Sequence, residues 1–121
     1  IYRFDQAHGD AVTAISCSKT SQRFTSASSD KFLKRWKIDR SFLARESLPT
    51  GHKDEITQII LNTQKGHVIT CSADRSVKIF DLKEGGILLE SFDNAHRRRI
   101  NTIALSNSGT IMFSGSNDKC I

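Results

Sequence analysis

A period of 44 residues runs through this chain and limits what it can fold into. The stretch from Ser26 to Trp36 combines small hydroxyl residues, an aspartate and a final aromatic residue. The same pattern returns from Thr70 to Phe80 and begins again at Ser114. Three histidines share the spacing: His8, His52 and His96. A fixed period of about 40–45 residues indicates a repeat architecture, in which stacked copies of one small unit bury a continuous core.

Each period contains short runs of β-branched, aromatic and small residues with turn formers between them, which is typical of β-strands. The first run is predicted as a buried strand in all three repeats: Val12–Cys17, Ile56–Leu61 and Ile100–Leu105. The later strands are predicted at residues 23–28, 67–72 and 111–116, then at 32–38 and 76–82, and then at 42–47 and 87–92. Residues 1–4 read as one further short strand.

The connections between these strands are too short for crossover helices, so the strands are expected to pair as antiparallel meanders. A helical period is absent, and the sequence therefore predicts an all-β fold. Pro49, the only proline, is expected in a loop between repeats, where no strand loses a hydrogen-bond donor.

The polar residues of each repeat keep a fixed spacing. A histidine lies four residues before an apolar strand residue, a hydroxyl residue lies four before an aspartate, and an aromatic residue lies six after that aspartate. The matching residues are His8, Val12, Ser26, Asp30 and Trp36, then His52, Ile56, Thr70, Asp74 and Phe80, then His96, Ile100, Ser114 and Asp118. This pattern resembles the WD-repeat family of β-propeller proteins, and the resemblance covers essentially the whole chain. The sequence departs from the family at the Trp-Asp pair, which reads Trp36-Lys37 and Phe80-Asp81, and at the glycine before the histidine, present only as Gly51.

The resemblance implies a partial β-propeller built from four-stranded antiparallel blades. Residues 8–47 are expected to form the first blade, 52–92 the second and 96–121 an incomplete third, with 1–4 as the outer strand of a preceding blade. The predicted strand count is thus one, four, four and three. Because propellers have about 4–8 blades, the remaining blades are expected from further residues of a longer protein or from another chain.

The resemblance also implies a structural role for the repeated polar residues. In the first repeat, Asp30 accepts a hydrogen bond from His8, and His8 contacts the hydroxyl of Ser26. That hydroxyl receives the indole N–H of Trp36. The corresponding sets are His52, Thr70, Asp74 and Phe80 in the second repeat, and His96, Ser114 and Asp118 in the third.

Two features of these sets remain open or differ between repeats. Three further hydroxyls share the same strand face and are the alternative contacts for the histidines: Ser28, Ser72 and Ser116. Phe80 has no N–H, so the second set is predicted to be shorter than the first. Asp74→Ala is therefore expected to cost less stability than Asp30→Ala.

Arg97, Arg98 and Arg99 form the largest departure from the repeat. The corresponding positions carry an acid in the other repeats, at Asp10 and Asp54. In propellers of the family this end of the blade is the usual docking face. The three arginines have three possible roles: a solvated surface, a docking site for an acidic protein segment, or a contact to nucleic acid or a phosphorylated ligand.

The sequence offers no nucleophile beside a base, no Gly-rich phosphate loop and no zinc spacing, so no catalytic residue, cofactor or metal site is predicted. The repeated histidines and aspartates are expected in different blades, where they cannot converge on one site. His67 breaks the period and is expected at the surface. Cys17 and Cys71 lie in apolar strand patterns and are predicted to be buried, reduced thiols.

These observations predict a non-enzymatic scaffold that mediates protein–protein interactions within a larger intracellular complex, in the cytoplasm or the nucleus. The expected partners are other proteins of a multi-subunit assembly. The alternative is an RNA-associated or ribosome-assembly subunit whose basic loops contact phosphate, and the net charge of +5 is compatible with either. No apolar run approaches the roughly 18–20 residues of a membrane span, so membrane insertion is not expected.

Overall fold

The computed structural model describes residues 3–18, 22–37 and 44–121, and ten β-strands account for the regular structure in them. Blade one consists of β1 (Val12–Cys17), β2 (Arg23–Ser28), β3 (Phe32–Lys37) and β4 (Ala44–Pro49). Blade two consists of β5 (Ile56–Asn62), β6 (His67–Ser72), β7 (Val77–Asp81) and β8 (Ile87–Phe92). Blade three contains β9 (Ile100–Leu105) and β10 (Met112–Ser116).

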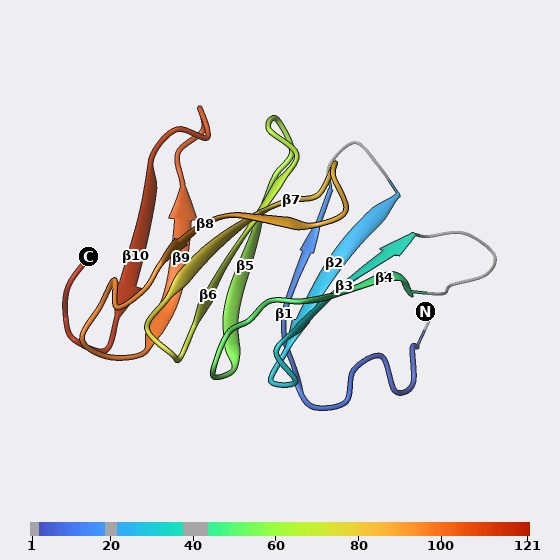
Figure 1. Cartoon of the computed structure of the whole chain (residues 1–121), viewed down its shortest axis with the longest axis horizontal. Coiled ribbons are helices and arrows are strands. Elements are labelled where there is room, and N and C mark those ends of the chain that lie inside the picture. Colours follow the sequence, from blue (N-terminus) through green and yellow to red (C-terminus); the bar gives the residue numbers. More distant parts are fainter. Residues whose placement is uncertain (1–2, 19–21, 38–43) are drawn as a thin grey trace.

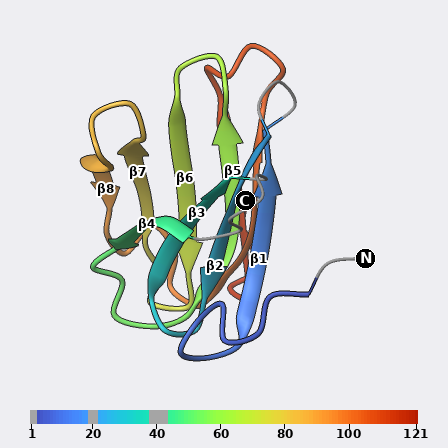
Figure 2. The same ribbon diagram turned by 90° about the vertical axis from the view of Figure 1, so that its right-hand side faces the viewer.

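Each blade is an antiparallel meander in which every strand pairs with the next one along the chain. The three blades stand side by side with their sheets face to face (Figure 1). The turned view places the first strands of blades one and two, β1 and β5, toward one side and the fourth strands, β4 and β8, toward the other (Figure 2). This arrangement of four-stranded antiparallel sheets is that of a partial β-propeller.

Apolar side chains fill the space between neighbouring blades. The interface of blades one and two is formed by Ala27 and Leu33 on one side and by Ile56, Ile59, Val68 and Phe80 on the other. The interface of blades two and three is formed by Ile69, Cys71 and Val77 against Ile100 and Ile103. Blade two therefore buries both faces of its sheet, and five of the six residues of β6 are buried.

The strand predictions are correct at their centres and shift at their ends. The fourth strand of blade one, predicted at 42–47, runs Ala44–Pro49, and residues 42 and 43 lie outside the described part of the chain. Pro49 is therefore the last residue of an edge strand, paired with Phe32, and not a loop residue. Proline has no N–H to donate, and at an edge strand the sheet does not require that hydrogen bond.

Two further predictions are wrong. Arg3 and Phe4 lie outside any strand, while residues 1 and 2 are outside the described residues. Phe4 packs its ring on Phe24 and Trp36 of blade one. The third blade has two described strands, not three, because only three residues follow Asp118 in this sequence.

The two strand cysteines differ in their exposure. Cys71 is fully buried between blades two and three, and burial raises the pKa of its thiol. Cys17 is exposed, contrary to the prediction. It lies on the face of β1 that also exposes Val12 and Ile15, and no other described blade covers that face. The apolar pattern of β1 therefore predicts the strand correctly, but it does not predict whether another sheet packs on that strand.

Candidate functional site

The polar set of blade one links four residues from the inner loop to the third strand. His8 Nδ1 lies 2.9 Å from Asp30 Oδ2, and His8 Nε2 lies 2.7 Å from Ser26 Oγ. The indole N–H of Trp36 donates to the same Ser26 oxygen at 2.8 Å. One arrangement satisfies the set, in which Nδ1 of His8 donates to Asp30 and Nε2 accepts from the hydroxyl of Ser26.

The set of blade two contains a residue that the repeat pattern did not indicate. His52 contacts Asp74 at 3.1 Å and Thr70 at 2.8 Å, as the resemblance to the WD-repeat family implies. Ser76 also donates its hydroxyl to Asp74 at 2.6 Å and lies 3.0 Å from His52. The corresponding residue of blade one is Phe32, which has no hydroxyl. The second set is therefore not shorter than the first, because Ser76 adds hydrogen bonds where Phe80 removes one.

The set of blade three repeats the same contacts without an aromatic member. His96 Nδ1 lies 3.0 Å from Asp118 Oδ2, and His96 Nε2 lies 2.8 Å from Ser114 Oγ. In all three sets the histidine contacts the earlier of the two candidate hydroxyls. The later hydroxyls have a different role, which is to donate to the carbonyl groups of the neighbouring loop: Ser28 to Asp10, Ser72 to Asp54, and Ser116 to Arg98 and Arg99.

Hydrogen bonds control the ionisation of the turn aspartates. Burial alone would raise the pKa of Asp74, but the Ser76 hydroxyl and the amides of Lys53 and Ser76 outweigh it and lower the pKa to about 2. Burial would likewise raise the pKa of Asp118, and the amides of Arg97 and Cys120 lower it to about 2. For His52 burial dominates and lowers the pKa, although Asp74 acts in the opposite direction. Each carboxylate is therefore held ionised beside a buried imidazole.

Each tight turn carries a cation that the repeat pattern does not indicate. The residue after each turn aspartate has a positive φ, and in all three blades it is basic: Lys31, Arg75 and Lys119. A left-handed backbone is uncommon for residues with long side chains. All three side chains are exposed. The turns therefore present three cations on the end of the blades that also carries the arginine loop.

The arginine loop has a fixed backbone and two free side chains. The amide of Arg97 donates to Asp118 at 2.9 Å, and the carbonyl of Arg99 accepts from the Asn117 amide at 3.1 Å. Arg99 forms an ion pair with Glu55 of blade two. Arg97 and Arg98 are exposed and form no ion pair with any described residue. Asp10 and Asp54, at the position of Arg98, each accept a bond from the next amide, so the change to arginine removes a local contact and adds a cation.

The described residues contain no group of three histidine, cysteine, aspartate or glutamate side chains that could hold a metal ion. They also include no helix long and apolar enough to cross a membrane. Each repeated histidine is bound within the set of its own blade. The three histidine–aspartate sets attach the loops to the sheets by hydrogen bonds. The exposed side chains at this end of the blades include the cations of the tight turns and of the arginine loop.

The comparisons with known proteins agree with the repeat pattern. The family model described as WD domain, G-beta repeat matches the chain three times, at residues 1–37, 45–81 and 86–121. No curated protein matches the chain.

Proposed function

Because this chain belongs to the WD-repeat family, we propose that it is a non-enzymatic scaffold which holds other proteins of an intracellular assembly. WD repeats generally mediate protein–protein interactions, and this general role is the basis of the proposal. The blades supply a rigid frame, and loops on a rigid frame are where binding residues concentrate.

The arginine loop is the observation that carries the proposal. Asp118 accepts a hydrogen bond from the amide of Arg97, and the hydroxyl of Ser116 donates to the carbonyls of Arg98 and Arg99. The loop is thus ordered before any partner arrives, and little entropy is lost when a partner binds. Its free guanidinium groups, on Arg97 and Arg98, suit bidentate contacts with carboxylates.

Neighbouring cations extend this docking surface beyond the loop. The carbonyl of Arg75 accepts a hydrogen bond from the amide of Ala95, so the turn of blade two lies against the start of the loop. Lys119 follows Asp118, which binds the amide of Arg97. We define the basic face as Arg75, Arg97, Arg98 and Lys119. A surface with this charge is expected to attract an acidic segment of a partner protein and to speed its encounter.

The test compares the proteins captured by the wild-type protein and by the Arg98→Glu variant at matched salt, after nuclease treatment, with mass spectrometry as the readout. The variant is expected to lose at least one partner, while its unfolding midpoint stays close to that of the wild type, because exposed charges contribute less than about 1 kcal/mol to folding. Lys65→Glu is the matched control, since it reverses one exposed cation at the opposite end of blade two.

Identical partner lists for the wild type and Arg98→Glu would show that the loop is only a solvated surface. Equal losses for Arg98→Glu and Lys65→Glu would show that net charge matters and the basic face does not. Capture that disappears after nuclease treatment, with a steep dependence on salt, would favour the RNA-associated alternative. Arg99 is left unchanged in this design because its ion pair with Glu55 links blades two and three.

A further inference from the structure

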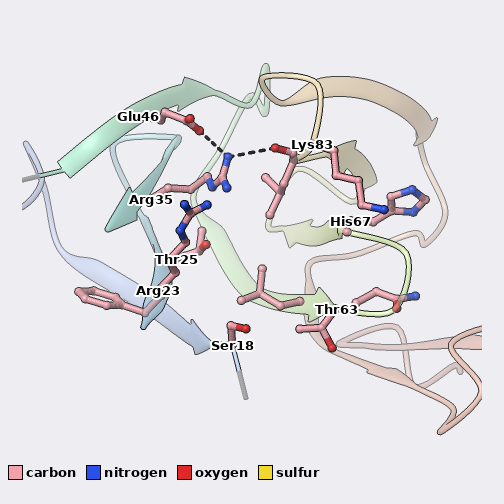
Figure 3. A pocket seen from close by; sticks show the side chains of 13 residues that line it. Ser18, Arg23, Thr25, Arg35, Glu46, Thr63, His67 and Lys83 are labelled. Carbon is pink, nitrogen blue, oxygen red and sulfur yellow. Dashed lines mark hydrogen bonds and ion pairs between the residues drawn. The ribbon is translucent and has the colours of Figure 1, made fainter. Parts of the chain in front are cut away.

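A cleft of about 590 Å³ opens between blades one and two, at the end of the blades opposite to the basic face (Figure 3). Arg23 and Arg35 of blade one line one wall, and His67 and Lys83 of blade two line the other. Leu61 and Leu82 form part of the apolar surface between them. We define these six residues as the inter-blade cleft.

The cleft exists because two core positions of the repeat are polar in blade one. In blade two, Ile69 and Ile79 occupy these positions and pack against blade three. In blade one the equivalent residues, 44 positions earlier, are Thr25 and Arg35. They pair across β2 and β3, and Arg35 faces Glu46 on β4. Thr25 and Arg35 thus form a polar row at positions that are apolar in blade two. Departures of this kind from the pattern of a fold concentrate at functional sites.

The charges in the cleft are unbalanced. Arg35 donates to Glu46 and to the carbonyl of Leu82, and these contacts hold its guanidinium across the gap between the blades. Arg23 and Lys83 are exposed and form no ion pair within the described part of the chain. A second hollow at the same end, about 360 Å³ in volume and bordered by Leu61 and Leu105, has no charged residue in its lining. The inter-blade cleft therefore carries an excess of positive charge that this second hollow lacks.

We propose that the inter-blade cleft binds a phosphorylated serine or threonine on an extended segment of a partner protein. A phosphate group carries about −1.5 to −2 charges at neutral pH, which matches the two uncompensated cations, Arg23 and Lys83. Its three acceptor oxygens suit a bidentate guanidinium together with an ammonium group better than the two oxygens of one carboxylate do.

The shape of the cleft supports a peptide as the carrier of the phosphate. A further hollow of about 280 Å³ adjoins the cleft and shares Thr25, Arg35, Glu46 and Leu82 with it. Its lining also includes Leu33, Leu48 and Gly86. The two hollows together form a groove with a cationic part and a more apolar part. An extended chain that places an apolar side chain near its phosphorylated residue fits both.

The experiment measures binding of three labelled peptides to the purified protein by fluorescence anisotropy. The peptides carry phosphoserine, glutamate or serine at one central position between leucines, and are otherwise identical. The phosphoserine peptide is expected to bind most tightly, and Arg23→Glu and Lys83→Glu are each expected to weaken it by at least about tenfold. Lys65→Glu, on the same turn as the cleft but outside its lining, is expected to change the dissociation constant by less than about twofold.

Amide resonances of the wild-type protein provide a second readout that does not depend on any variant folding. The phosphoserine peptide is expected to shift the resonances of Thr25, Leu61 and His67 and to leave those of Arg97 and Arg98 in place. Absence of binding, equal binding of all three peptides, an equal loss with Lys65→Glu, or shifts confined to the basic face would each overturn the proposal. Because Arg98→Glu leaves the cleft intact, the failure of this site and that of the basic face are distinguishable.

Discussion

Ser76 shows how one side chain can replace a lost contact elsewhere in the same set. Phe80 has no N–H to donate to Thr70, whereas Trp36 donates to Ser26 in blade one. The hydroxyl of Thr70 can donate to the carbonyl of Lys78 at 3.3 Å, but this contact does not replace the missing indole donor. Ser76 then gives Asp74 an additional donor. Asp74 therefore receives four hydrogen bonds, from His52, Lys53 and both the amide and the hydroxyl of Ser76.

Asp74→Ala is expected to destabilise the protein more than Asp30→Ala, which reverses the order predicted from the sequence. Asp30 receives three hydrogen bonds, from His8, Gly9 and Phe32, one fewer than Asp74. Asp30→Ala leaves the buried His8 imidazole without its acceptor, whereas Asp74→Ala removes the acceptor of His52 and of three further donors. We therefore expect losses of about 2–4 kcal/mol, with Asp74→Ala at the upper end. Urea unfolding at neutral pH measures both.

Ser76→Ala provides the control for this comparison. It removes one donor and should cost about 1 kcal/mol by itself. In the Ser76→Ala background, Asp74→Ala should cost no more than Asp30→Ala does in the wild type. A larger cost for Asp30→Ala in the unmodified protein would contradict the role given to Ser76.

Acid is expected to lower the free energy of unfolding in two stages. The pKa of His52 is lower in the folded state than its usual 6.5, so the unfolded chain takes up a proton first as the pH falls through that value. The free energy of unfolding is therefore unaffected by His52 above pH 6.5, and it falls as the pH drops below that value. The pKa of Asp74 is about 2, against 3.8 in an unfolded chain, so its contribution is complete above 3.8 and is lost as the pH falls toward 2.

Urea midpoints measured at a series of pH values test both stages. The second stage should not exceed about 2 kcal/mol for Asp74, and Ser76→Ala should reduce it, because the Ser76 hydroxyl helps to hold the carboxylate ionised. A midpoint that is constant between neutral pH and pH 5 would refute the first stage. If Ser76→Ala left the second stage unchanged, the hydrogen bond from Ser76 could not be the cause of the lowered pKa of Asp74.

At the scale of the strand, side chains join each blade to the next in addition to the apolar core. Thr57 on β5 donates to the carbonyl of Ile100 on β9 at 2.7 Å. Gln58 accepts from the amide of Ile103 at 2.7 Å. Thr13 holds the place of Thr57 in blade one, but its hydroxyl is buried without a partner in the described residues. The interface of blades one and two and that of blades two and three therefore share one residue pattern. The threonine hydroxyl has a hydrogen-bond partner in the described residues only at the second interface.

Thr57→Val is expected to destabilise the protein by about 1–2 kcal/mol, because it removes the hydrogen bond to Ile100 and keeps the shape of the side chain. Thr13→Val is the matched control. It removes a buried hydroxyl that has no described partner, so it should be neutral or slightly stabilising. Thermal unfolding of both variants distinguishes them, and equal losses would show that the contact between β5 and β9 contributes nothing of its own.

The repeat spacing predicted the strands of blade two, because they depend on residues that recur at 44-residue intervals. The three histidine–aspartate contacts were expected from the resemblance to the WD-repeat family, not from the spacing. The spacing did not predict features that arise where the repeats differ. The hydroxyl of Ser76 and the polar row of Thr25 and Arg35 are changes at single positions, whose effects depend on the facing side chains. The exposure of Cys17 could not be predicted either, because a strand pattern does not show whether another sheet covers it.

In the described part of the chain, the sheet faces at the two ends of the row of blades expose apolar side chains. Blade one exposes Val12 and Ile15 on the face turned away from blade two. Blade three exposes Phe113 and Ile121 on the face turned away from blade two, and Ile121 is 92% accessible. The equivalent residues of blade two are buried or partly buried in its two interfaces. The two end faces are thus opposite halves of the interface that repeats inside the molecule.

The 121-residue chain expressed alone is expected to associate, because such complementary faces form head-to-tail contacts. Sedimentation velocity over a range of concentrations should show species larger than the monomer. Ile15→Glu should reduce the association without unfolding the chain, since Ile15 is 61% exposed in the monomer. A monomer at all concentrations, or association unchanged by Ile15→Glu, would contradict this prediction.

The bond between Trp36 and Ser26 makes the only tryptophan of this sequence a spectroscopic reporter for a single blade. Its indole N–H is held by a hydroxyl that also contacts His8, and its ring stacks on Phe24 at a centroid distance of 5.8 Å. One indole resonance and one fluorescence signal therefore follow the state of blade one. No indole lies in blades two and three, so loss of structure there would leave both signals unchanged until it reached the first blade.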